Sequence, residues 1–232
     1  MPEIKKAPLY EMGFNEDDEF NTGITAIGVV TDPAIMKDFF AFSNQKPEEK
    51  VREYKFVQAA GEAKKMLVGP AMIPKLPIYR NDDEHGEYYV FASEETIRKL
   101  SYSFIKNGRQ NNATIEHMTM ADGMHIVETW IVEDPKKDKS NAYGMEHPKG
   151  TWMIAMQVRN QAIWDNFIAT GELKGFSIEG LLWNKLKSGG EDEKPKGRED
   201  FGKANKRIES AVRAVAKVMN SKNYRNDKGM FV

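Results

Sequence analysis

Gly175-Phe176-Ser177-Ile178-Glu179-Gly180 is the stretch that decides the fold, because it predicts a strand that presents a serine hydroxyl. It follows the amphipathic segment 161–173, and its glycines allow another backbone to approach closely. A serine hydroxyl is a poor nucleophile unless a base lies within hydrogen-bond reach. His117 is the histidine best placed to supply that base, since it enters a short apolar run ahead of a strong strand pattern.

The pattern before residue 184 predicts strands that alternate with turns, and few helices, with residues 34–42 as a short helix or loose turn. We expect strands at 24–30, 51–58, 65–72, 88–92, 113–118, 125–132, 151–158 and 176–183. The first helix begins at its capping residue Ser93, carries an apolar stripe through Phe104 and ends at Gly108; the second covers 161–170. This content predicts an α+β domain, with a mainly antiparallel sheet closed into a barrel-like form and helices packed around it.

The segments 113–118 and 125–132 predict a hairpin, because Ala121-Asp122-Gly123 between them is a turn signal. In the second arm, strict alternation places Glu128 on the same face as Ile126 and Trp130. A carboxylate among large apolar side chains must find a partner or change its pKa. Glu128 is therefore either a functional residue or an edge carboxylate that faces water.

Composition excludes several classes of function. The 232 residues are 40% hydrophobic, enough for one core, and 34 basic against 35 acidic side chains leave a formal net charge of −1. No global charge therefore favours nucleic acid or a membrane surface. The absence of cysteine excludes a disulfide framework, a thiol nucleophile and a cysteine zinc site. With a polar N-terminus and no apolar run of membrane-spanning length, we expect a cytosolic protein.

The composition changes after residue 184. Residues 185–203 are rich in Gly, Lys, Glu and Asp, which is typical of a solvated linker, and helical periodicity returns in 204–232. We therefore expect a single domain over 1–184, with an N-terminal extension of about twenty residues, followed by a linker and a C-terminal helix and tail. That helix is either a surface helix or one that docks on a scaffold or capsid protein, and Gly189-Gly190-Glu191 is a candidate self-cleavage site.

An ordered set of sequence blocks resembles the XkdF-like phage serine proteases, the prohead or capsid maturation protease group of tailed phages. The resemblance covers about residues 10–183, and the order of the blocks makes it specific. The blocks are Gly69-Pro70-Ala71-Met72-Ile73-Pro74, Pro77-Ile78-Tyr79-Arg80, Tyr88-Tyr89-Val90-Phe91-Ala92-Ser93-Glu94-Glu95-Thr96-Ile97, Val127-Glu128-Thr129-Trp130-Ile131-Val132-Glu133-Asp134, Gly150-Thr151-Trp152-Met153 and Gly171-Glu172-Leu173-Lys174-Gly175-Phe176-Ser177-Ile178-Glu179-Gly180.

The resemblance implies a herpesvirus-assemblin-like protease fold and a serine endopeptidase that needs no metal or other cofactor. Ser177 would be the nucleophile, His117 the general base and Glu128 the third member of the triad. Some members of the wider fold class take a second histidine from a strand after the serine, but no histidine follows Ser177 here. Glu179, Glu133 and Asp134 therefore stay open as rivals of Glu128.

The resemblance also implies where the protein works. Its substrates would be the phage scaffold and major capsid proteins, and often its own termini, cleaved inside the prohead in the host cytoplasm. We expect no nucleic acid or membrane partner, and a homo-oligomer stays open. Two alternatives stay open as well. One is a catalytically inactive structural or scaffold-associated head protein, and the other is a metal-dependent hydrolase that uses His117, His125 and Glu128, although the chain has no His-Glu-x-x-His motif.

Overall fold

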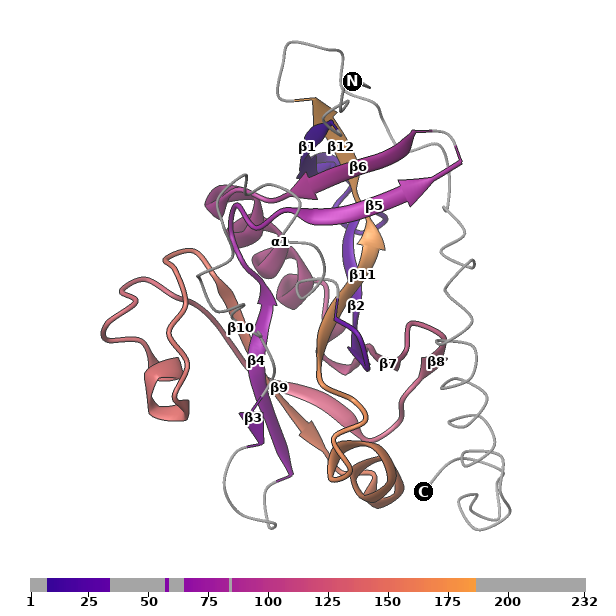
Figure 1. Ribbon diagram of the computed structural model, residues 1–232, viewed down its shortest axis with the longest axis vertical. Coiled ribbons are helices and arrows are strands. Elements are labelled where there is room, and N and C mark those ends of the chain that lie inside the picture. The colour runs from indigo at the N-terminus through magenta and orange to yellow at the C-terminus, as the bar shows by residue number, and fades with distance from the viewer. Residues whose placement is uncertain (1–7, 34–56, 59–64, 84, 187–232) are drawn as a thin grey trace, which may run out of the picture.

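The computed structural model describes residues 8–33, 57–58, 65–83 and 85–186, which form three four-stranded sheets around one core (Figure 1). In the first sheet the order is β12 (Trp183–Leu186), β1 (Leu9–Gly13), β6 (Gly86–Phe91) and β5 (Ile78–Asp82). In the second it is β3 (Val57–Gln58), β4 (Met66–Met72), β10 (Trp152–Val158) and β9 (Met124–Ile131). In the third it is β11 (Gly175–Leu181), β2 (Gly23–Val30), β7 (Ala113–Ile115) and β8 (Thr119–Met120).

Strand pairing is mainly antiparallel, as predicted, but two pairs are parallel. These are β1 with β6 and β2 with β7. None of the three described sheets closes on itself, so the described part of the chain is a set of open sheets packed on one another and not a closed barrel. The assemblin-like arrangement stays a prediction.

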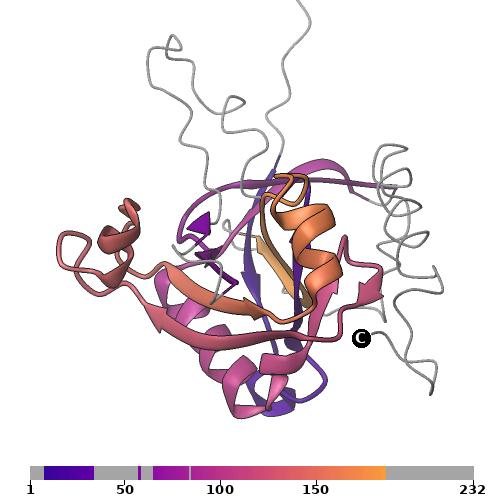
Figure 2. The same ribbon diagram turned by 90° about the horizontal axis from the view of Figure 1, so that it is seen from below.

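Helix α1 (Glu94–Lys106) joins two of the sheets, because it contacts both β2 and β10 (Figures 1 and 2). The Ser93 hydroxyl accepts a hydrogen bond from the Thr96 N–H at 3.3 Å, which is the cap that the sequence predicts. On the inner side, the ring of Phe104 meets the edge of Trp152 with 5.5 Å between ring centroids. Both side chains are fully buried, so this contact fixes the helix against the sheet.

The remaining helices in the described residues are short. They are the 3₁₀ helices η1 (Glu16–Asp18), η4 (Arg109–Asn111) and η5 (Lys139–Tyr143), the α-helical turn α2 (Gln161–Ile163), and the π-helical turn η6 (Trp164–Ile168), which follows α2 directly. Together α2 and η6 occupy the place of the predicted second helix. None of the described helices has both the length and the apolar character that crossing a membrane requires.

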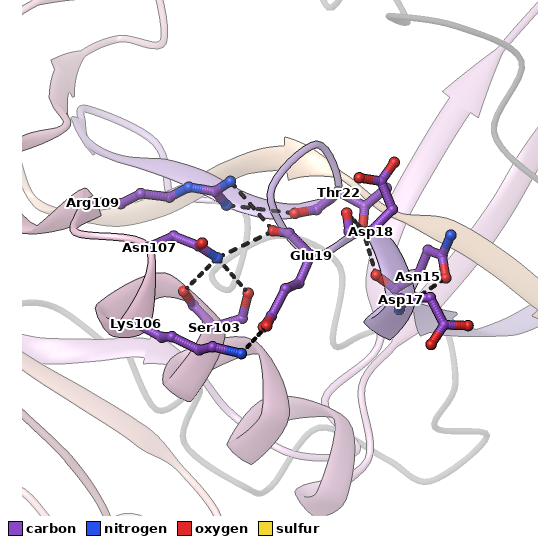
Figure 3. A network of polar contacts seen from close by, with 9 residues as sticks. All are labelled: Asn15, Asp17, Asp18, Glu19, Thr22, Ser103, Lys106, Asn107 and Arg109. Carbon is purple, nitrogen blue, oxygen red and sulfur yellow. Dashed lines mark hydrogen bonds and ion pairs between the residues drawn. The ribbon is translucent and has the colours of Figure 1, made fainter.

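Arg109, directly after α1, fixes the loop that leads into β2 (Figure 3). Its guanidinium is buried and donates to backbone carbonyls, including that of Ile24 at 2.7 Å and that of Phe20. On the same loop, the Glu19 carboxylate accepts from Lys106. Burial lowers the pKa of Arg109, while the charge of Glu19 raises it. These bonds set where β2 begins and therefore the register of the strand at the centre of the third sheet.

The predicted hairpin of 113–118 with 125–132 is wrong. β7 pairs with the short strand β8, whereas β9 leaves that sheet after Gly123 and pairs with β10. Gly123 has a φ of +78° and its turn packs against Asn160, so the chain changes sheets at the point where the sequence shows only a turn. The sequence analysis also predicted no strand at β1 or β5.

Some predictions fall on residues outside the described part. These are the segment 34–42, most of the strand 51–58, nearly all of the linker 185–203, the C-terminal helix and the candidate self-cleavage site. The start of the predicted linker is described, because β12 extends to Leu186.

Candidate active site

Ser177 and Glu179 project from the same face of β11, because residues two apart on a strand point to the same side. Ser177 lies opposite Gly28 of β2, and Gly28 lies opposite Thr114 of β7. These three residues form one row across three strands. The side chains of Ser177, Glu179 and Thr114 therefore gather on one face of the third sheet.

His117 reaches the same face from the turn after β7. The turn is closed by the Met118 N–H, which donates to the Ile115 carbonyl at 3.1 Å. Both of its central residues are left-handed, with φ of 52° at Glu116 and 58° at His117. Such values are costly for residues other than glycine and gather at functional sites. The Glu116 carboxylate is buried and accepts from the Thr31 N–H at 2.6 Å, which holds the turn in place.

Gly28 makes room for the imidazole. A β-carbon at this position would lie 3.1 Å from both Nδ1 and Cε1 of His117, and 3.0 Å from the Thr114 hydroxyl oxygen. Both distances are shorter than ordinary van der Waals contact. The ring therefore lies directly over the backbone of β2, beside the strand that carries Ser177.

Glu179 is the acidic residue that contacts His117. Its Oε1 is 3.0 Å from His117 Nδ1 and also accepts a hydrogen bond from the Thr114 hydroxyl. Burial raises the pKa of Glu179, but the hydrogen bonds from His117 and Thr114 outweigh it, so the net pKa lies below the usual value. A carboxylate that stays ionised here holds the proton of the imidazole on Nδ1 and leaves Nε2 as an acceptor.

Ser177 shares this face, but no described side chain makes a hydrogen bond with its hydroxyl. The residue is partly buried, and a small cavity of about 20 Å³ touches it and its neighbours Phe176 and Ile178. In free enzymes the bond between nucleophile and base is often long and tightens only when substrate binds. The arrangement is therefore that of an aligned base and acid, with a serine one strand away on the same side.

Glu128, predicted as the third member, lies in a different sheet. It is paired with Ala155 on β10, and its carboxylate, half exposed to solvent, forms an ion pair with Lys139. The register of β9 against β10 shifts next to Glu128, which interrupts the strict alternation on which its predicted face depended. The structure therefore places the rival Glu179, and not Glu128, beside His117.

The other rivals are also elsewhere. Glu133 accepts from Arg98 at 2.6 Å, and Asp134 accepts from the backbone N–H of Lys136 at 3.0 Å, both on the surface. The three ligands of the alternative metal site, His117, His125 and Glu128, do not come together either. His125 contacts Asn111, and Glu128 contacts Lys139. Among the described residues, no three His, Asp or Glu side chains gather as a metal site would require.

Two residues of the site, Gly28 and Thr114, were missed from the sequence, and only Gly28 had a signal. Gly28 interrupts an otherwise apolar strand, and a glycine there is a sign of close approach by another group. Thr114 precedes His117 by three residues, but nothing in the sequence shows that its hydroxyl would bind Glu179. That contact exists only because β7 and β11 flank the same central strand.

Comparison with known proteins identifies a family for most of the described chain. A family model described as "Putative phage serine protease XkdF" matches residues 47–183, which is more than half of the chain and includes both Ser177 and His117. Searches of curated proteins and of solved structures gave no match.

Proposed function

The chain belongs to the XkdF family of phage serine proteases, and from this premise we propose that it is a serine endopeptidase in which Ser177 is the nucleophile, His117 the general base and Glu179 the orienting acid. The observation that carries this assignment is the 3.0 Å contact between His117 Nδ1 and Glu179 Oε1, on the face of the sheet that also carries Ser177. Glu179 replaces Glu128 in the assignment.

The proposed chemistry is acyl transfer in two steps. Ser177 Oγ attacks the carbonyl carbon of the scissile peptide bond while His117 Nε2 takes the hydroxyl proton. The C–N bond then breaks, and the same proton passes to the leaving amine, which leaves an ester on Ser177. A water molecule, deprotonated by His117, attacks that ester; the C–Oγ bond breaks, the imidazole returns the proton to Ser177 Oγ, and the carboxylic acid is released. Throughout, the Glu179 carboxylate stabilises the positive charge that forms on the imidazole.

A serine-directed fluorophosphonate probe tests the nucleophile without a known substrate. We expect the full-length chain to be labelled once, and labelling to be lost in Ser177→Ala and strongly reduced in His117→Ala. Ser101→Ala is the matched control, because Ser101 is buried on α1 and its hydroxyl donates to the Arg98 carbonyl, away from the site. Equal labelling of the wild type and Ser177→Ala would refute the assignment.

We further propose that the substrates are the scaffold and major capsid proteins of the phage, cleaved during head maturation in the host cytoplasm. Co-expression with these two proteins should give shortened products that are absent with Ser177→Ala. The competing function is a structural head protein without activity, and it is favoured by the observation that no side chain in the described part of the chain bonds to the Ser177 hydroxyl. In that case neither labelling nor shortening would occur.

A further inference from the structure

A groove of about 550 Å³ lies between helix α1 and strand β9, and none of the candidate active-site residues lines it. One wall is a single face of α1, because its lining residues Arg98, Tyr102 and Ile105 recur at intervals of three and four. The other wall is the last part of β9, residues 129–131. The groove therefore has a helix on one side and a strand on the other.

The outer edge of β9 carries unpaired backbone groups. Within the described part of the chain β9 ends its sheet and pairs only with β10. Directly after β9, the Val132 N–H donates to the Thr151 carbonyl at 2.9 Å, and the Val132 carbonyl accepts from the Gly150 N–H at 2.8 Å. Both backbone groups of Val132 therefore face the partner strand. Because these directions alternate along an antiparallel pair, the N–H and C=O groups of Ile131 and Thr129 face away from β10.

The side chains of β9 show that the groove runs along this edge. The Thr129 hydroxyl accepts from the indole N–H of Trp152 at 2.6 Å, and Trp152 packs on α1, so Thr129 faces the helix. Trp130 points to the other face, where its indole N–H donates to Asp138 at 3.1 Å. A groove that touches both faces of an end strand follows the edge of that strand. Its walls are open to solvent, since Tyr102 on the helix is 59% exposed.

The charged groups at the two ends of the groove already have partners. Arg98 donates to Glu133 at 2.6 Å at one end, and Lys106 pairs with Glu19 at the other; Figure 3 shows the second pair. The lining between these pairs is uncharged. A charged occupant would lose its hydration in the groove without gaining a free partner. The groove therefore favours an uncharged occupant with apolar side chains.

The length of the groove suits a short extended chain. From Arg98 to Lys106 the helix rises about 12 Å, at about 1.5 Å per residue. An extended chain covers that distance with about four residues, at about 3.3 Å each. Four residues are enough to reach the outward backbone groups of both Ile131 and Thr129.

We propose that this groove binds an extended, uncharged segment of another protein chain, which adds to the second sheet as a strand beside β9. Hydrogen bonds to the backbone of Ile131 and Thr129 hold the segment, and every second side chain packs between β9 and α1. The inference goes beyond the proposed function and does not depend on it, because the groove and Ser177 lie on different sheets.

The test measures the binding of short peptides to the full-length Ser177→Ala protein. The parent pool contains heptapeptides, blocked at both ends, in which Val or Ile alternates with Ser, Thr or Gln. Two further pools keep these side chains but carry N-methyl groups, on the apolar residues in one pool and on the polar residues in the other. An added strand turns the N–H groups of only one set toward β9. We therefore expect one methylated pool to lose at least about tenfold in affinity and the other to bind like the parent.

A variant of the helix wall assigns the binding to this groove. Tyr102→Lys places an uncompensated charge between Arg98 and Lys106, and it should weaken binding of the parent pool by at least about tenfold. Met120→Lys is the matched control, since Met120 is also 59% exposed but lies on β8 of another sheet, and its binding should equal that of the parent protein. Thermal unfolding shows whether each variant keeps its fold.

Several results would overturn the proposal. One is that the parent pool does not bind, or that it binds the folded Tyr102→Lys variant as tightly as the parent protein. Another is that the two methylated pools behave alike. A dimer in solution that Tyr102→Lys turns into a monomer would show that a second copy, and not another protein, occupies the groove. None of these results depends on the serine, so the peptidase assignment is tested separately by the fluorophosphonate probe.

Discussion

Gly28 lies directly beneath the imidazole of His117, so close that a methyl group on its α-carbon would be 3.1 Å from two ring atoms. The same methyl group would be 3.0 Å from the Thr114 hydroxyl oxygen. One strand position therefore controls both the base and the residue that helps to hold its carboxylate partner.

Gly28→Ala should lower peptidase activity by at least about tenfold, because the imidazole must shift by a few tenths of an ångström to admit the methyl group, and small misplacements of a catalytic group are costly. Gly28→Val should lower it further. Thermal unfolding provides the control, since the turn that carries His117 can give way without loss of the core. The steric explanation fails if Gly28→Ala keeps wild-type activity in a probe-labelling time course.

Glu179→Gln should reduce kcat by about a hundredfold or more, because the amide can no longer hold the protonated Nδ1 of His117 and stabilise the imidazolium. Glu128→Gln is the matched control and should stay close to the wild type, since its carboxylate forms an ion pair with Lys139 on another sheet. Rates of probe labelling or peptide cleavage compare the two. The reverse order, with Glu128→Gln the more damaging, would restore the assignment made from sequence.

The contrast between Glu128 and Glu179 shows what the sequence could predict. Local patterns predicted the central strand of the third sheet, the cap and length of α1, and the strand that carries Ser177, because each depends on neighbouring residues. The sequence placed Glu128 on the strand that follows His117, and the predicted hairpin would have paired that strand with the segment that carries the histidine. β9 pairs instead with β10, and the choice between partners depends on the packing of whole sheets, which no short segment encodes.

Thr114→Val should raise the pKa of Glu179. The variant removes a hydrogen-bond donor to the carboxylate, while the burial that raises its pKa remains. A carboxyl carbon titration by NMR measures this directly. The lowered pKa in the wild type contributes stability that is present above the unfolded value of ~4.5 and is lost as the pH falls through the folded value, so the variant should lose less stability on acidification. An unchanged titration midpoint would contradict the role given to Thr114.

His147 should make the fold sensitive to mild acid. The side chain is 4% exposed, and burial lowers its pKa against the opposing charge of Asp138. The unfolded chain therefore binds more protons than the folded one below about pH 6.5. Stability that is present above this pH should fall as the pH drops, by up to about 1.4 kcal/mol per pH unit, until the folded pKa is passed.

Urea unfolding of the wild type and of His147→Leu at a series of pH values measures this contribution. Only the difference in slope between the two proteins counts, because the substitution also changes packing. Parallel curves from pH 7 to pH 5 would show that His147 does not titrate in this range.

Ser177 and Glu179 are neighbours on alternate positions of a single strand, so any displacement of that strand carries both along together. The position of His117 relative to these two residues is then set by one segment, the left-handed turn at Glu116 and His117. Inserting or deleting a single residue between the serine and the glutamate would place one of the two side chains on the opposite face of the sheet. Substitutions around the turn would only shift the imidazole and lower the activity. The spacing on β11 should therefore tolerate far less variation than the turn does.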